Sequence, residues 1–204
     1  MRQGFFFWVC IAESVLFCCV RAAYEVRARR SQGRAEFKEG RGRAALHLTG
    51  SLLFVLTLLT YTLAPALFEW AELALPAWLQ WVGAVMGGAS VPLILWVHSA
   101  LGSNFSTTLH VRDEHTLVVY GPYRWVRHPM YTVLYMYLIA VFLLTRNWLV
   151  GAVSLAALTA IIFRRLQKEE ETMIEKFGDE YRWYMRRTGR FLPRPGEVAR
   201  SVVG

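Results

Sequence analysis

Long apolar stretches separated by short polar segments dominate the chain. Three of these stretches approach the roughly 20 residues that a helix needs to cross a bilayer. They are Gly4 to Val20, Ala44 to Phe68 and Ala77 to Leu101. A fourth stretch, from Pro129 to Phe163, is interrupted only by Arg146 and Asn147, and its length suits two helices that form a hairpin. The pattern therefore predicts an all-α, polytopic membrane bundle of about five transmembrane helices, the last two paired as a hairpin.

A more polar segment follows the last apolar stretch. Met173, Ile174 and Phe177 recur there at helical spacing, and charged residues occupy the remaining positions, which predicts an amphipathic helix leaving the last span. Gly178 is placed to end this helix, and Tyr181 begins another short turn.

The distribution of Lys and Arg predicts how the bundle is oriented. Residues 21–43 contain eight basic and three acidic residues, and the segment from Arg164 onward contains ten basic and seven acidic residues. The turn after the second stretch carries Glu69 and Glu72 but no cation. Because cytoplasmic loops carry the excess of Lys and Arg, we expect the N-terminus outside, and the C-terminus and its amphipathic helix in the cytosol.

Composition supports a membrane protein and argues against other classes. Hydrophobic residues make up 55% of the 204, and the mean hydropathy is +0.30, which excludes a disordered or strongly polar chain. The net charge of +8 lies between apolar stretches, so it predicts contact with membrane lipids and not with nucleic acid. A signal peptide at residues 1–23 is disfavoured, since Arg21 is too close to the cleavage point and further apolar stretches follow. No metal site is expected, because the three cysteines, Cys10, Cys18 and Cys19, lie in the first stretch without metal-binding spacing.

A polar and aromatic segment before the hairpin carries the first candidate chemistry. Gly121 and Pro122 mark a turn, and Pro129 suits the first turn of a helix. Arg127 and His128 are therefore placed at a helix N-terminus, where free N–H groups and the helix dipole favour an anion. These residues predict a site for a carboxylate or a phosphate at the cytosolic face of the membrane.

The order of the motifs resembles a known family. The run from Gly121 to Tyr131 (GPYRWVRHPMY), preceded by His115 and followed after the hairpin by Glu169 and Glu170, is similar to the isoprenylcysteine carboxyl methyltransferases. That family is related to the phospholipid N-methyltransferases and to other small integral-membrane methyltransferases. The resemblance extends from 101 to 193, about half of the chain.

The resemblance implies a site for S-adenosylmethionine between the RHPxY segment and the helix with the paired glutamates. It implies eight cofactor-binding residues, namely Gly121, Tyr123, Arg127, His128, Pro129, Tyr131, Glu169 and Glu170. It also implies three catalytic candidates, namely Arg165, Glu169 and His115. Arg164 is adjacent to Arg165, so the register of that arginine is open by one residue. The chain then divides into 1–101, three helices with a basic loop, and 102–204, the methyltransferase core.

Methyl transfer requires donor and acceptor to be held in line, and these residue types suit that task. Arg127 and His128 can hold the methionine carboxylate of the cofactor, and tyrosine rings can face its sulfonium. An ionised carboxylate acceptor needs orientation alone, for which Arg165 is the candidate. A thiol or amine acceptor also needs a base, either His115 or a glutamate.

Several alternatives stay open at this level. The acceptor is predicted to be lipophilic or lipidated, but a carboxylate, an amine and a thiol all fit, and the oligomeric state is not readable. An NADPH-dependent reductase of the sterol reductase type shares an RHPxY-like segment, and a non-catalytic lipid-binding bundle is a third interpretation. Glu13, an acid within a span, is a functional candidate by default but has no evident partner, so it stays outside the predicted site.

Overall fold

The computed structural model describes residues 4–31, 41–102 and 116–194, without the side chains between 28 and 51. These residues form five α-helices and two short 3-10 helices. The elements are α1 (Phe5–Ser31), α2 (Arg41–Leu63), η1 (Pro65–Ala71), α3 (Ala77–Leu101), η3 (Gly121–Arg124), α4 (Pro129–Thr145) and α5 (Trp148–Arg187). In the described part of the chain the β-structure amounts to two isolated bridges, so the all-helical prediction is confirmed.

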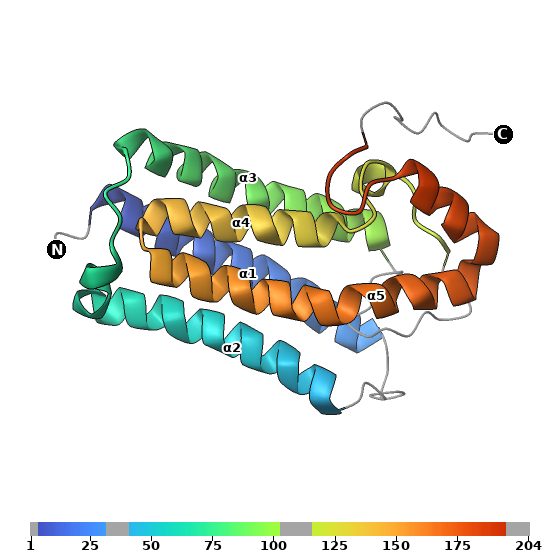
Figure 1. Cartoon of the computed structure of the whole chain (residues 1–204), viewed down its shortest axis with the longest axis horizontal. Helices are drawn as coiled ribbons and strands as arrows, with labels where there is room; N and C mark the ends of the chain where they lie inside the picture. Colours follow the sequence, from blue (N-terminus) through green and yellow to red (C-terminus); the bar gives the residue numbers. More distant parts are fainter. Residues whose placement is uncertain (1–3, 32–40, 103–115, 195–204) are drawn as a thin grey trace.

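The helices lie side by side in one elongated bundle (Figure 1). α3 packs on α1 and α4, and α5 packs on α4 and α2. One apolar core joins α1, α3 and α4. In this core the ring of Phe17 is stacked flat on that of Tyr137, with 4.1 Å between the ring centres. The core thus runs across both halves of the chain.

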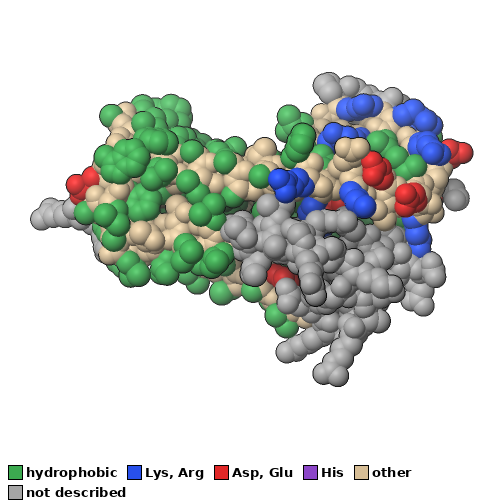
Figure 2. Space-filling view, turned by 60° about the horizontal axis from the view of Figure 1, so that its bottom comes forward, with side chains coloured by type: hydrophobic (Ala, Val, Ile, Leu, Met, Phe, Trp, Pro, Cys, Tyr) green, Lys and Arg blue, Asp and Glu red, His purple; other side chains and the backbone are tan. Residues whose placement is uncertain are grey.

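Three helices, α1, α3 and α5, are long and apolar enough to cross a membrane. The end of α2 and η1 together make a fourth candidate, bent by 102°, and α4 is a shorter apolar helix of 17 residues. Hydrophobic side chains cover the surface over much of the bundle, and most of the visible Lys, Arg, Asp and Glu gather toward one end (Figure 2). The chain is an integral membrane protein.

The predicted hairpin is present, with its turn at the two polar residues that interrupt the apolar stretch. Arg146 ends α4 in the left-handed conformation (φ 49°) and pairs with Glu72 at 2.8 Å. Asn147 caps α5, because its side-chain oxygen accepts a hydrogen bond from the Val150 N–H. α4 and α5 are therefore antiparallel neighbours.

Small residues of α3 allow close helix contacts. A Cβ atom on Gly83 would meet the Ala140 carbonyl oxygen of α4 at 3.1 Å. A Cβ atom on Gly87 would collide with the Glu13 carboxylate of α1, whereas at Gly88 the nearest carboxylate oxygen is 3.6 Å away. Glu13 thus occupies the space that Gly87 leaves, which gives this membrane acid a packing partner.

α5 is longer than any other helix and changes direction at Gly178, where φ is +54° and a side chain is disfavoured. The part after Gly178 turns back toward the charged end of the bundle, where η3 also lies (Figure 1). This turn brings residues 181–191 against the segment that precedes α4. It builds the charged end from parts of the chain that are far apart in sequence.

Candidate active site

The segment that precedes α4 is fixed by backbone hydrogen bonds on two sides. α4 begins at Pro129, and the His128 carbonyl accepts hydrogen bonds from the N–H groups of Tyr131 (3.1 Å) and Thr132 (3.2 Å). On the other side, the Arg127 N–H donates to the Gly189 carbonyl at 2.8 Å. The predicted start of this helix is confirmed, and Arg127 and His128 lie at its N-terminus.

Glu170 of α5 is the centre of a buried ionic cluster. Its Oε1 accepts a hydrogen bond from the Arg127 Nε at 3.2 Å and lies 3.2 Å from the His128 Nε2. Its Oε2 accepts from a terminal nitrogen of Arg190 at 2.5 Å. The side chains of Glu170 and Arg127 are each only 7% exposed, so this pair is shielded from water.

The electrostatics of Glu170 follow from these partners. Burial alone would raise the pKa of the Glu170 carboxyl, but hydrogen bonds from His128 and Arg190 and the charge of Arg127 outweigh it and lower the pKa to about 2. Glu170 is therefore ionised at every physiological pH and serves as a fixed negative charge.

Glu169 lies beside this cluster but is more accessible, with 20% of its side chain exposed. It accepts hydrogen bonds from the Tyr131 hydroxyl and from the Arg165 Nε, each at 2.9 Å. Arg164 is exposed, whereas Arg165 is the arginine that contacts Glu169. The two glutamates are thus held by different partners, and Glu169 is the more exposed of the two.

The segment after α5 folds over the start of α4. Arg127 donates hydrogen bonds to the carbonyls of Met185 (2.9 Å) and Thr188. The Tyr184 hydroxyl donates to the Tyr123 carbonyl at 2.6 Å. In this arrangement the Arg127 side chain joins Glu170 to the C-terminal segment, because its guanidinium N–H groups donate to both.

Two further residues that were predicted to bind the cofactor, Gly121 and Tyr123, belong to the turn that lies next to the cluster. Gly121 begins η3 with φ +60°, and a Cβ atom there would meet the Ala100 side chain at 3.3 Å, which explains the glycine. Burial raises the pKa of Tyr123, and the nearby Tyr184 and Glu169 add to the shift. His115, the other catalytic candidate, lies outside the described residues.

Sequence reasoning missed Arg190 and Tyr184 as parts of this cluster. Arg190 donates to both oxygens of Glu170, and Tyr184 ties the end of α5 to η3. No spacing rule pairs these residues with partners 20 and 61 residues away. The available signal was Gly178 itself, since a glycine after an amphipathic helix allows the chain to reverse.

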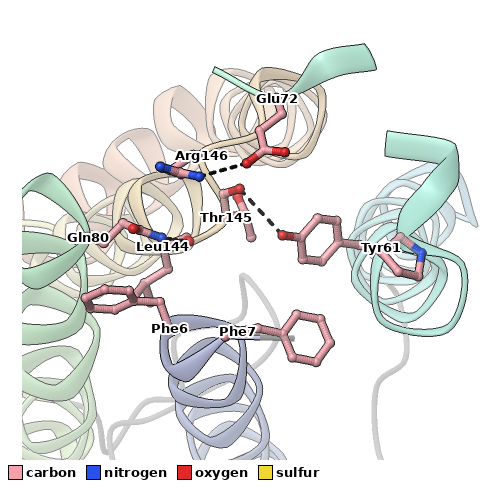
Figure 3. A pocket seen from close by; sticks show the side chains of 10 residues that line it. Phe6, Phe7, Tyr61, Glu72, Gln80, Leu144, Thr145 and Arg146 are labelled. Atoms are coloured by element: carbon pink, nitrogen blue, oxygen red, sulfur yellow. Dashed lines mark hydrogen bonds and ion pairs between the residues drawn. The ribbon is translucent and has the colours of Figure 1, made fainter. Parts of the chain in front are cut away.

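A cavity of about 230 Å³ lies at the opposite end of the bundle. Figure 3 shows Phe6, Phe7 and Tyr61 on one side and the ion pair of Glu72 and Arg146 on the other. Its volume falls below the roughly 300 to 1,000 Å³ of common ligand sites. The cavity also lies at the other end of the bundle from Glu169. The candidate active site is therefore the ionic cluster at the charged end and not this cavity.

Part of the chain matches a known family. Residues 84–175 match the isoprenylcysteine carboxyl methyltransferase (ICMT) family. The human protein-S-isoprenylcysteine O-methyltransferase is 35% identical over 127 residues, which is 61% of this chain and 44% of that protein. The Xenopus laevis protein of the same name is 31% identical over 147 residues, which is 66% of this chain and 51% of that protein. The chain thus aligns with about half the length of these relatives.

A solved structure shares the fold. The structure of the eukaryotic intramembrane Ras methyltransferase ICMT superposes with a TM-score of 0.61 at 19% sequence identity. The superposition covers 95% of this chain and 69% of that one. The two chains therefore share a fold, while the sequence match to the family lies between α3 and α5.

Proposed function

Because residues 84–175 carry the sequence of the ICMT family, we propose that this chain is an integral-membrane methyltransferase that uses S-adenosylmethionine and a lipophilic acceptor. One observation carries the proposal. The RHPxY segment and the paired glutamates, 38 to 43 positions apart in the chain, meet through Tyr131 with Glu169 and Arg127 with Glu170. They meet at the charged end of an otherwise apolar bundle, which suits a polar cofactor and a lipid-borne acceptor.

The residues at this end fit the chemical groups of S-adenosylmethionine. The cofactor has a sulfonium and an amino group, both positive, together with ribose hydroxyls, and carboxylates such as Glu169 accept from or attract all of these. The tyrosine rings at 123 and 131 suit a cation or an adenine. When bound, S-adenosylmethionine supplies an electrophilic methyl group on a positively charged sulfur.

We assign different tasks to the two glutamates. Glu169, oriented by Tyr131 and Arg165, would contact the cofactor. Glu170 would act with Arg127, His128 and the N-terminus of α4 at Pro129, holding the 185–190 segment over the site and excluding water from it. Gly121 would keep the η3 turn close to α3. Arg165, beside Glu169, would orient the acceptor, and His115 remains the proposed base for an acceptor that carries a proton.

The acceptor and the topology complete the proposal. The relatives are named for a prenylated cysteine, so an S-prenylcysteine or another lipidated molecule entering from the bilayer is the proposed acceptor. We propose five spans, α1 to α5, the last two as the hairpin, with the part of α5 beyond Phe163 as the amphipathic cytosolic extension. The positive-inside rule places the N-terminus outside and the 102–204 core with its site at the cytosolic face.

Methyl transfer in membranes tests this function. Native membranes containing the chain should move a labelled methyl group from S-adenosylmethionine to at least one of three acceptors, an S-farnesylcysteine carboxylate, a lipid amine or a lipophilic thiol. Membranes without the chain are the control, and release of the label by base identifies an ester. Absence of transfer to every acceptor, with the protein folded and abundant, would exclude the proposed activity.

A further inference from the structure

The cavity at the end of the bundle away from the ionic cluster combines an ion pair with aromatic side chains. Figure 3 shows Glu72 and Arg146 on one side of it and Phe6, Phe7 and Tyr61 on the other. These residues come from α1, from the end of α2, from the segment after η1 and from the turn between α4 and α5. The proposed function does not use this cavity, although it joins four parts of the chain.

Exposed tryptophans place the cavity at the depth of the lipid headgroups. Trp70, Trp78, Trp81 and Trp148 lie at this end of the bundle and are between 41% and 66% exposed. The ring of Trp81 is 5.1 Å from that of Phe6, which lines the cavity. Because tryptophan is enriched where a membrane meets water, this end lies at a membrane interface. Phospholipid headgroups are therefore the molecules that surround the cavity.

Arg146 has N–H donors that its ion pair does not use. One terminal nitrogen donates to the Glu72 Oε1 at 2.8 Å, and among the described residues this is the hydrogen bond recorded for the guanidinium. A guanidinium has five such donors, and 31% of this side chain is exposed. Its forked geometry suits the oxygens of a phosphate. Arg146 can therefore bind a phosphate at the cavity and keep its contact with Glu72.

The turn between α4 and α5 does not itself require an arginine at 146. The residue has φ +49°, a left-handed conformation in which glycine or asparagine usually ends a helix. The contact of this turn with the segment after η1 also uses the backbone, because the Arg146 carbonyl accepts a hydrogen bond from the Leu73 N–H at 2.7 Å. The exposed guanidinium is therefore an addition to the turn and not a condition for it.

The aromatic side of the cavity suits a cation. The π faces of aromatic rings attract cations, and Phe7 and Tyr61 line the cavity with 6.1 Å between their ring centres. Gln80 donates through its amide nitrogen to the Leu144 carbonyl at 3.1 Å. Within the described residues no hydrogen bond is recorded for its Oε1 or for the Oε2 of Glu72, so both can accept from a ligand. A headgroup that carries a phosphate and an ammonium thus finds a partner for each charge.

We propose that this cavity binds the headgroup of a zwitterionic phospholipid, with the phosphate on Arg146 and the ammonium against Phe7 and Tyr61. Its volume of about 230 Å³ fits a ligand that inserts only its headgroup and leaves its acyl chains in the bilayer. The bound lipid holds α1, the end of α2 and the turn between α4 and α5 together. The proposal does not depend on methyl transfer, which is assigned to the other end of the bundle.

Lipid retention by the full chain tests this site. The protein is placed in nanodiscs of equal parts phosphatidylcholine and phosphatidylglycerol, released, and examined by native mass spectrometry for the lipid that stays bound. The parent should retain phosphatidylcholine in preference, since phosphatidylglycerol has the phosphate but no ammonium. Arg146→Gln should reduce the retained phosphatidylcholine roughly tenfold, because a charge-assisted hydrogen bond to the phosphate is lost. Arg186→Gln, which removes an exposed cation at the charged end, should retain lipid as the parent does.

The Glu72→Gln variant distinguishes a headgroup site from an ion pair that only joins the helices. It breaks the same pair as Arg146→Gln but keeps the arginine for the phosphate and removes the carboxylate that favours an ammonium. It should therefore shift retention toward phosphatidylglycerol, whereas Arg146→Gln should lower retention of both lipids. A purely structural pair would give the two variants the same loss of thermal stability and the parental lipid preference.

A Phe7→Leu variant covers the case in which breaking the ion pair impairs folding. It keeps Glu72 and Arg146 and removes one aromatic ring, so it should lower the retention of phosphatidylcholine several-fold and leave that of phosphatidylglycerol unchanged. Equal retention of the two lipids by the parent, or the parental preference in both Arg146→Gln and Phe7→Leu, would overturn the headgroup site. Either result would leave the methyltransferase function standing, because methyl transfer is measured separately.

Discussion

The Glu170→Gln variant should lose about 3 to 5 kcal/mol of stability, the range for removing one partner of a buried ion pair. Arg127 would then be buried without its countercharge, while a glutamine offers it only a neutral oxygen. Because Arg127 also holds the carbonyls of Met185 and Thr188, the 185–190 segment should detach from η3 and the start of α4. The measurements are the midpoint of thermal unfolding and the rate of proteolysis in this segment.

Glu171→Gln is the matched control for this effect. Glu171 is the next residue of α5, but it is exposed and contacts Gln167, so its loss should change stability by less than about 0.5 kcal/mol. The pKa of Glu170 adds a second test. Since it falls from 4.5 to about 2 on folding, the stability that this carboxylate supplies is complete above pH 4.5 and is lost as the pH falls toward 2. Equal stability of the two variants at neutral pH would contradict the assigned role of Glu170.

The Glu169→Gln variant should instead lose activity with little loss of stability. Glu169 is partly exposed, and a glutamine can still accept hydrogen bonds from Tyr131 and Arg165. What disappears is the negative charge that we assign to the cofactor. A hydrogen bond to a charged group contributes about 1.5 to 3 kcal/mol, so kcat/KM for S-adenosylmethionine should fall about 10- to 150-fold. Methyl-transfer kinetics at saturating acceptor measure this change.

Glu175→Gln provides the comparison for Glu169, because Glu175 is an exposed carboxylate further along α5. It should retain parental kinetics. If Glu169→Gln kept the parental kcat/KM, or if its loss of activity matched a loss of folded protein, Glu169 would have no part in cofactor binding.

Much of this architecture follows from the sequence because a bilayer restricts the choices. A chain in lipid satisfies its backbone by forming helices, so apolar stretches of suitable length predict the spans directly. Local rules also sufficed at the two turns that matter. Pro129 begins α4, and the polar pair Arg146 and Asn147 marks the hairpin. Helical spacing likewise predicted the Arg165 and Glu169 neighbours, which the structure pairs at 2.9 Å.

The long-range parts of the site did not follow from any such rule. The resemblance indicated that the RHPxY segment and the paired glutamates share a site, but not that Arg127 and His128 contact Glu170 and Tyr131 contacts Glu169. The contact of Arg190 with Glu170 depends on the direction that the chain takes after Gly178, which no periodicity specifies. Likewise, Glu13 fits against Gly87 because α1 and α3 pack together at that point. The spacing of residues along the sequence does not predict which residues of two different helices meet.

Calorimetric titration of the purified, folded protein with S-adenosylhomocysteine and, separately, with NADPH tests the proposed cofactor. We expect S-adenosylhomocysteine to bind at one site per chain and NADPH not to bind. Saturable binding of NADPH without binding of S-adenosylhomocysteine would instead assign the charged end of the bundle to a reductase. Binding of neither compound would contradict a site for either cofactor at this end of the bundle.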